Sequence, residues 1–161
     1  MMTHFANKEA APRVLVVDDE EMQRILARTS LEQAGFIVDE AADGAQALDR
    51  FAESLPDLVL LDVRMPVLDG FETCRAIRES PEGRHTPILM LTGLDDVDSI
   101  DRAYRSGATD FAVKPINWLI IGHRLSYMLR ASHDAEQLRL SEARLNNAQR
   151  IAPLGYWDWR P

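Results

Sequence analysis

Leu58-Val59-Leu60-Leu61-Asp62-Val63-Arg64-Met65-Pro66 is the stretch of sequence that decides the fold. Its four leading residues are apolar, too few for a buried helix, and prolines flank the run, so we predict a strand that is covered on both faces, as in a parallel sheet. The strand ends at Asp62. Ligands bind at the carboxyl ends of strands in open α/β sheets, so we expect Asp62 to point into a site. The plainer alternative is an Asp that caps the next turn.

Four more short apolar runs indicate strands, and each of the first four strands along the chain is followed by a helical pattern. These runs are 14–17, 36–38, 87–91 and 111–113. The helical patterns between strands cover about 20–35, 45–55, 69–80 and 95–107. Strands that alternate with helices in this way predict parallel βαβ units with right-handed crossovers. We therefore predict an α/β fold, a flavodoxin-like doubly wound five-stranded parallel sheet of order 2-1-3-4-5, with an extended C-terminal helix.

The composition is that of an ordinary globular protein with an acidic balance. The 161 residues are 46% hydrophobic and 27% charged, with a net charge of -8, and this predicts neither a nucleic-acid partner nor a membrane partner. The single cysteine, Cys74, cannot form an internal disulfide, which fits a reducing cytoplasm. Residues 1–12 contain no apolar export segment, and we interpret them as a flexible leader.

Four of the predicted strands end at polar residues that differ in chemistry. The ends carry Asp18 with Asp19, Asp62, Thr92 and Lys114, and the parallel topology would bring them to the same edge of the sheet. Two carboxylates about 4 Å apart repel by roughly 4 kcal/mol at an effective dielectric constant near 20, so the acidic group favours a bound cation. Since no His or Cys accompanies it, Mg²⁺ is the expected cofactor.

The same residues suggest phosphoryl chemistry. Lys114 adds a positive charge and Thr92 a hydroxyl donor, which together with Mg²⁺ would stabilise a phosphoryl group in transfer. Asp62 is then the candidate nucleophile. Each residue also has a plainer interpretation: Asp18 and Asp19 as helix caps, Thr92 as a turn residue and Lys114 as a solvated lysine. The joint pattern favours a shared site.

After Pro115 the pattern becomes that of one long helix, over about 117–150, which would be roughly 50 Å long. Ala131, Leu138 and Leu145 repeat every seven residues, so we predict a signalling helix, and possible coiled coil, over 131–150. A solvated single helix remains the alternative. Residues 151–161 contain two tryptophans, and we interpret them as the start of a truncated downstream domain.

Taken together, these motifs resemble the receiver domain of bacterial two-component response regulators. The resemblance covers about 13–130 and is carried by the following groups: Val14–Asp19, Leu60–Pro66 with Asp69-Gly70, Leu91–Gly93, Gly107–Phe111 and Lys114-Pro115. It implies that a sensor histidine kinase or a phosphotransfer protein phosphorylates Asp62. It also implies that Mg²⁺ is held by Asp19, Asp62, the backbone carbonyl of Arg64 and, through water, Asp18. Thr92 and Phe111 would be the switch pair.

The resemblance further implies a phosphoacceptor rather than an enzyme, with an output domain in cis, and we expect it to signal through the long helix as a homodimer. The segments 114–118 and 122–130 are similar to receivers that head diguanylate cyclase or cyclic-di-GMP phosphodiesterase regulators, and 141–159 is similar to the start of a PAS domain. No GGDEF or EAL motif occurs in the chain. Gly93, where receivers often carry Ala, is one departure. Arg64 and Leu94 hold the two positions that influence phosphoryl lifetime in receivers.

Three rival functions can be weighed on the residues alone. A Mg²⁺-dependent phosphohydrolase would need a second acid two residues after its aspartyl nucleophile, but this position is Arg64. A carrier of FMN would need a phosphate-binding loop after the first strand, where Asp18 to Glu21 would repel the phosphate. A degenerate receiver that serves only for docking fits poorly with the intact acidic set, Thr92 and Lys114.

Overall fold

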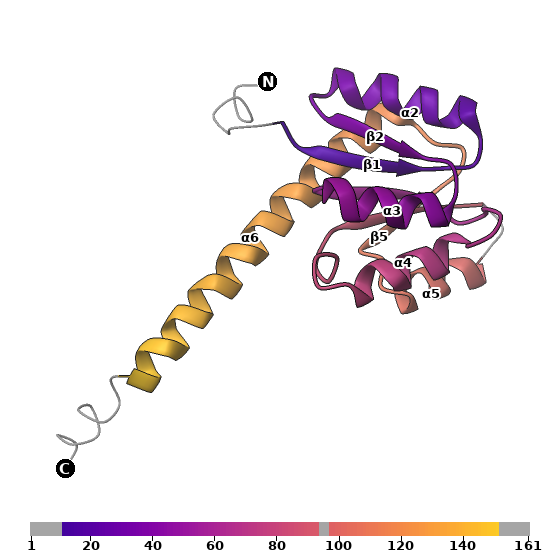
Figure 1. Ribbon diagram of the computed structural model, residues 1–161. Coiled ribbons are helices and arrows are strands. Elements are labelled where there is room, and N and C mark those ends of the chain that lie inside the picture. Colours follow the sequence, from indigo (N-terminus) through magenta and orange to yellow (C-terminus); the bar gives the residue numbers. More distant parts are fainter. Residues whose placement is uncertain (1–10, 94–96, 152–161) are drawn as a thin grey trace, which may run out of the picture. The chain divides into compact units, whose positions relative to one another are not determined.

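The computed structural model describes residues 11–93 and 97–151, and its centre is a parallel sheet of five strands (Figure 1). The strand order is β2-β1-β3-β4-β5, which confirms the predicted flavodoxin-like topology. The strands are β1 (Arg13–Val17), β2 (Ile37–Ala41), β3 (Leu58–Asp62), β4 (Ile88–Thr92) and β5 (Asp110–Val113). All four pairings between neighbouring strands are parallel, so all five carboxyl ends lie along one edge of the sheet.

Helices cover both faces of this sheet (Figure 1). They are α2 (Glu21–Gln33), α3 (Gly44–Ser54), α4 (Gly70–Glu79), α5 (Val97–Arg105) and α6 (Trp118–Ile151). Side chains of α2 and of the first turns of α6 join one apolar core cluster, and side chains of α3, α4 and α5 join the other. Each strand of the centre is therefore buried from two sides.

The pleat of β3 explains why its sequence is continuously apolar. Leu58 and Leu60 belong to the cluster under α2 and α6, whereas Val59 and Leu61 belong to the cluster under α3, α4 and α5. Successive side chains of a strand point to opposite faces, so a strand covered on both faces needs apolar residues at every position. All five residues of β3 are buried, including Asp62 at its end.

The turn from β3 into α4 is fixed by local signals that were visible in the sequence. Asp69 caps α4 by accepting a hydrogen bond from the backbone N–H of Glu72, whose side chain bonds back to the N–H of Asp69. Gly70 is needed for close approach, because a Cβ there would lie 2.4 Å from the backbone oxygen of Asp62. The helix therefore starts directly against the end of the strand that carries Asp62.

Two elements differ in detail from their sequence patterns. Strand β2 extends to Ala41, through Asp39 and Glu40, whose charges concealed it; arginine side chains pair with both carboxylates. Helix α2 is present, but several of its large apolar side chains lie on the surface rather than in the core. Met22, Ile25 and Leu26 are exposed, whereas Ala27 and Leu31 form the buried face.

Helix α6 is continuous over 34 residues, which confirms the predicted extended C-terminal helix. Two compact units divide between Leu129 and Arg130, inside this helix. The predicted boundaries of the leader, the receiver, the coiled coil and the downstream domain stay predictions, and residues 1–10 and 152–161 lie outside the described part. Among the described residues, none of the helices is long and apolar enough to cross a membrane.

One partly buried cation, Arg78, connects the loops at the opposite end of the sheet from Asp62. Arg78 of α4 donates hydrogen bonds to the carbonyl oxygens of Gly83, Thr86 and Gly107 and to the hydroxyl of Thr109. These acceptors belong to the loop before β4 and to the connection between α5 and β5. A single side chain therefore satisfies several backbone groups that water reaches poorly.

Arg78→Ala should lower the free energy of unfolding by about 2–4 kcal/mol, because it leaves several partly buried acceptors without a donor. Urea unfolding followed by circular dichroism measures the change. Arg75→Ala, an exposed arginine on the same helix, is the matched control, and it should cost less than about 0.5 kcal/mol. Equal losses in the two variants would contradict the structural role of Arg78.

Candidate functional site

The carboxyl edge of the sheet collects the polar residues that end four strands. Asp18 follows β1, Asp62 and Thr92 are the last residues of β3 and β4, and Lys114 follows β5. The ammonium Nζ of Lys114 lies 2.7 Å from Oδ1 of Asp62. Residues that are up to 96 positions apart (18 and 114) therefore meet at one place because the strands are parallel and adjacent.

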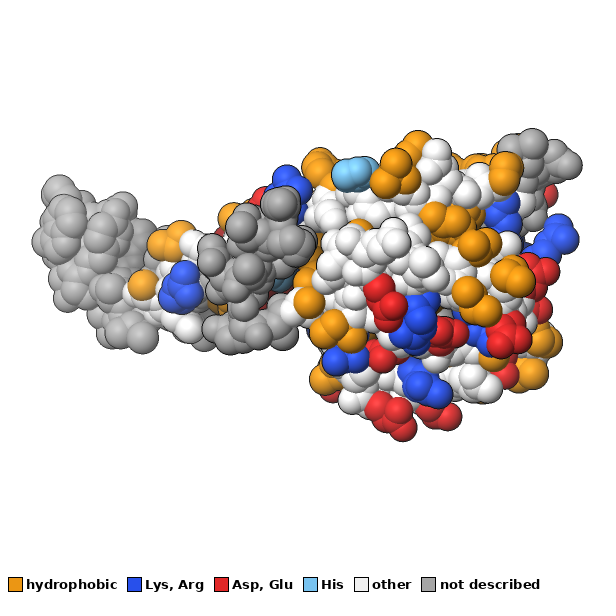
Figure 2. All heavy atoms as spheres, turned by 90° about the horizontal axis from the view of Figure 1, so that it is seen from above, with side chains coloured by type: hydrophobic (Ala, Val, Ile, Leu, Met, Phe, Trp, Pro, Cys, Tyr) orange, Lys and Arg blue, Asp and Glu red, His pale blue; other side chains and the backbone are white. Residues whose placement is uncertain are grey.

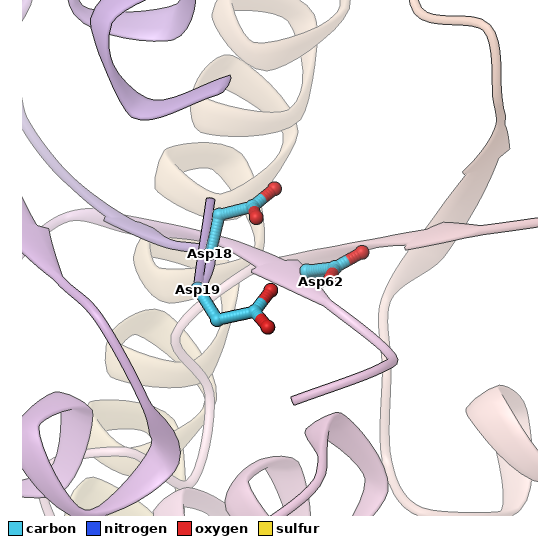
Figure 3. A group of neighbouring side chains, drawn as sticks. All are labelled: Asp18, Asp19 and Asp62. Atoms are coloured by element: carbon cyan, nitrogen blue, oxygen red, sulfur yellow. The ribbon is translucent and has the colours of Figure 1, made fainter. Parts of the chain in front are cut away.

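Three carboxylates form the acidic cluster, which we define as Asp18, Asp19 and Asp62 (Figure 3). One oxygen from each lies within 4.8 Å of the others, and Figure 3 shows the three side chains turned to the same side. Asp18 and Asp62 are only 4% and 3% exposed, whereas Asp19 is open to solvent. The cluster therefore has a buried floor and one accessible acid.

Burial and mutual repulsion raise the pKa values of the two buried acids. The pKa of Asp18 rises from 3.8 to about 6, chiefly because it is buried and further because Asp62 and Asp19 are near. Burial also raises the pKa of Asp62, although its hydrogen bond with Lys114 opposes the shift. The pKa of Lys114 is raised too: burial would lower it, but the hydrogen bond to Asp62 and the negative charges of Asp62, Asp18 and Glu20 together outweigh that effect. One ammonium thus faces three carboxylates.

This donor set suits a hard divalent cation. All candidate ligands in the cluster are carboxylate oxygens, which small, hard cations prefer to nitrogen or sulfur ligands. A cation would also relieve the repulsion that raises the pKa of Asp18. The residues present therefore fit the expected cofactor chemistry.

The structure places the remaining predicted site residues as follows. Thr92 is almost fully buried, and its hydroxyl lies 3.4 Å from the carbonyl oxygen of Gly93. Phe111 is half-buried and makes an edge-to-face contact with Tyr104, with ring centroids 5.6 Å apart. Arg64 is exposed in the turn that follows β3. Their predicted roles as switch pair and carbonyl ligand stay predictions.

A pocket of about 520 Å³ opens beside the cluster at this edge of the sheet. Asp19 forms part of its wall, and the other lining residues are Val63, Arg64, Met65, Asp69, Phe71, Ser99 and Arg102. The guanidinium of Arg102 lies 4.1 Å from the centre of the Phe71 ring. Sequence reasoning gave no role to Arg102, because the contact depends on how α4 and α5 pack.

Comparison with known proteins points to one family. The model of the response regulator receiver domain matches residues 14–123. Response regulator PleD of Caulobacter vibrioides is 39% identical over 131 residues, or 81% of this chain and 29% of that protein. The phosphate regulon transcriptional regulatory protein PhoB of Rhizobium meliloti is 40% identical over 119 residues, or 74% of this chain and 52% of that protein. The chain thus spans about half or less of these two relatives.

Solved structures agree with the family match. A structure of the Vibrio cholerae chemotaxis protein CheY4 is 36% identical, with a TM-score of 0.70, and the match covers 73% of this chain and 98% of that one. A response regulator receiver domain protein from Clostridium thermocellum is 28% identical, with a TM-score of 0.68 and coverage of 79% and 98%. The family match over residues 14–123 contains the acidic cluster and the strand ends around it.

Asp18→Asn should stabilise the metal-free protein at neutral pH. Because the pKa of Asp18 is higher in the folded state, its contribution is favourable below about pH 4 and is lost as the pH rises through about 6. Removing the charge should therefore raise the free energy of unfolding by about 1–3 kcal/mol at pH 8, with a gain that shrinks toward pH 4. Urea unfolding in EDTA measures it. A gain that grows toward acid pH would contradict the assignment.

Proposed function

We propose that this chain, which belongs to the response regulator receiver domain family of two-component systems, accepts a phosphoryl group on Asp62 and passes the change to an output domain in cis. The observation that carries the proposal is the buried carboxylate of Asp62, 2.7 Å from Lys114 and beside two further acids. Such a set can form an aspartyl phosphate and stabilise its oxygens.

The proposed transfer is a displacement at phosphorus. A carboxylate oxygen of Asp62 forms the new P–O bond, and the bond from phosphorus to the donor nitrogen or oxygen breaks, its electron pair leaving with the donor. Lys114 bonds Asp62 before transfer and can follow the charge to the phosphoryl oxygens. Mg²⁺, when bound by Asp19, Asp62, the Arg64 carbonyl and, through water, Asp18, supplies charge neutralisation at those oxygens.

The same geometry argues for a phosphoacceptor rather than a phosphohydrolase. A hydrolase would need an acid near the leaving group two residues after Asp62, but this position carries the exposed cation Arg64. Cyclase or phosphodiesterase activity, if the full protein has it, would belong to a domain beyond this chain. A phosphorylation-independent docking module is the remaining alternative, and the intact cluster counts against it.

The switch is proposed to run from Thr92 through Phe111 to α6. Arg124 of α6 donates hydrogen bonds to the backbone carbonyl of Phe111, at 2.9 Å, and to Asp110, at 2.8 Å. The Phe111 ring packs against Tyr104 of α5. A shift of Phe111 toward Thr92 would therefore disturb contacts of both helices, which is how a local charge can bias a two-state element.

The proposed phosphodonor is a sensor histidine kinase or a phosphotransfer protein. Met22, Ile25 and Leu26 expose apolar surface on α2, the helix that begins two residues after Asp19. Figure 2 shows apolar side chains gathered on this side of the molecule, next to a group of acidic and basic side chains. An apolar surface beside the acidic cluster suits a protein donor that must reach Asp62.

The proposed output is a downstream domain in a homodimeric protein of cytoplasmic two-component signalling. The relatives PleD and PhoB extend well beyond the matched region, which agrees with further domains in the full protein. A link to cyclic-di-GMP remains the expectation drawn from the sequence after Lys114. Exposed Leu138 and Leu145 on α6 supply the apolar seam that a parallel pair of helices would bury.

Asp62→Asn should keep the fold but should not be phosphorylated by acetyl phosphate with Mg²⁺, because the amide is not a nucleophile for phosphorus. Intact mass spectrometry should show a phosphoryl-sized gain in the wild type alone. The matched control is Asp49→Asn, an exposed acid on α3, which should label normally. Normal labelling of Asp62→Asn would contradict the assignment, and absence of label in every protein would favour the docking module.

Replacing both Leu138 and Leu145 with Asp should weaken self-association at least tenfold, because each leucine is 60% exposed and its burial in a dimer would contribute about 1–2 kcal/mol. Sedimentation velocity over a range of concentrations measures the change. Leu140→Asp, an exposed leucine off the seven-residue repeat, is the control and should have little effect. The same association state in all three proteins would contradict the coiled-coil prediction.

A further inference from the structure

Arg24 of α2 links three parts of the structure around the acidic cluster. Its Nη1 donates a hydrogen bond of 2.7 Å to the backbone carbonyl oxygen of Asp18, and its Nε donates one of 3.0 Å to Oε1 of Glu40 in β2. The side chain of Arg24 is only 16% exposed. Hydrogen bonds from a charged, partly buried donor are among the stronger ones in proteins, so this contact can fix the turn that follows β1.

Three polar groups of Asp18 form hydrogen bonds with the surrounding protein. Its N–H donates to the carbonyl of Ala41, at 3.1 Å, and its Oδ1 accepts from the N–H of Glu20, at 2.9 Å. The third group is the carbonyl that Arg24 holds. This carbonyl belongs to the peptide group that joins Asp18 to Asp19, so its orientation sets the direction in which the Asp19 carboxylate leaves the backbone.

Arg24 acts on geometry rather than by adding a net charge. Glu40 also accepts a hydrogen bond from Arg28, which in turn pairs with Glu32, so this group holds two cations and two anions. Burial would raise the pKa of Glu40, but the hydrogen bonds and positive charges of Arg28 and Arg24 together lower it, which keeps Glu40 ionised. The negative field of the acidic cluster is therefore largely preserved.

We propose that Arg24 is a positioning residue: by holding the peptide between Asp18 and Asp19, it keeps both carboxylates beside Asp62 in the arrangement that binds a divalent cation. The inference rests on the proposed function, because it concerns the same cation. Repulsion among the three acids tends to open the turn when no cation is bound. Without Arg24, cation binding must first close the turn, so the affinity falls.

The test is Mg²⁺ affinity, measured by isothermal titration calorimetry on the unphosphorylated chain. Arg24→Met keeps a long side chain but removes the donors, and it should raise the Mg²⁺ Kd about tenfold, the lower end of the effect of groups that orient metal ligands. Arg24→Lys restores a donor and should fall between this variant and the wild type. The matched control is Arg28→Met, which removes ion pairs with Glu40 and Glu32 and should stay within about twofold of the wild type.

A kinetic readout separates positioning from general damage to the fold. With acetyl phosphate as donor, Arg24→Met should need more Mg²⁺ for half-maximal labelling but should approach the wild-type rate when Mg²⁺ saturates. A lower rate at saturating Mg²⁺ with an unchanged Kd would contradict the inference. So would equal losses of affinity in the Arg24 and Arg28 variants.

Failure of the inference and failure of the proposed function are distinguishable. If the wild-type chain binds Mg²⁺ and the Arg24→Met variant binds it equally well, only the role of Arg24 is overturned. A wild-type chain that binds no Mg²⁺ overturns both. If Arg24→Met does not fold, Arg24→Gln replaces it, with the same tenfold loss expected and wild-type affinity counting against the inference.

Discussion

Repulsion among Asp18, Asp19 and Asp62 is the constraint on which the rest of the site depends. Two carboxylates about 4 Å apart cost on the order of 4 kcal/mol at an effective dielectric constant near 20, and burial of two of them makes ionisation harder still. Lys114 offsets only part of this cost, since the pKa of Asp18 stays raised to about 6. The fold must therefore hold the three acids close together despite their mutual repulsion until a cation or a phosphoryl group binds and changes the charge of the site.

The parallel sheet is what makes this possible. Its strands are covered on both faces, so their ends cannot move apart without opening two apolar clusters. Gly70 lets α4 begin against the backbone of Asp62, and the capping pair of Asp69 and Glu72 fixes the start of that helix. The packing of the core thus keeps the three acids at the edge of the sheet in one arrangement, although their repulsion opposes it.

The fold and the strand-end residues could be predicted from the sequence because both follow from short-range patterns. Apolar runs bounded by prolines identify buried strands, and parallel topology then brings Asp62, Thr92 and Lys114 to one edge. Which acids are buried could not be predicted, since Asp18 and Asp19 are neighbours in sequence but differ in exposure. That difference depends on the direction of the turn after β1.

Contacts that depend on the rotation of a helix about its axis could also not be predicted from the sequence. The helical pattern over 20–35 predicted α2 correctly, yet Met22, Ile25 and Leu26 lie on the surface, and Ala27 and Leu31 face the core. The same rotation brings Arg24 over the turn at Asp18. The spacing of residues within α2 does not predict this contact, because the carbonyl belongs to the turn between β1 and α2, outside the helix.

Three arginines from the surrounding helices hold backbone carbonyl groups. Arg24 bonds the carbonyl of Asp18 and Arg124 that of Phe111, whereas Arg78 bonds the carbonyls of Gly83, Thr86 and Gly107 at the opposite end of the sheet. A guanidinium suits this task because its several donors can bind a carbonyl and a second acceptor at once. For Arg24 and Arg124 the second acceptor is a carboxylate outside the acidic cluster, Glu40 and Asp110 respectively. The positive charges of Arg24 and Arg124 are therefore paired with these carboxylates, and the cation bonded to Asp62 is Lys114. The backbone at this edge of the sheet can therefore be held in place while the acidic cluster keeps its negative charge. A cation-binding site needs both properties, because its ligands must be ordered and must still attract the cation.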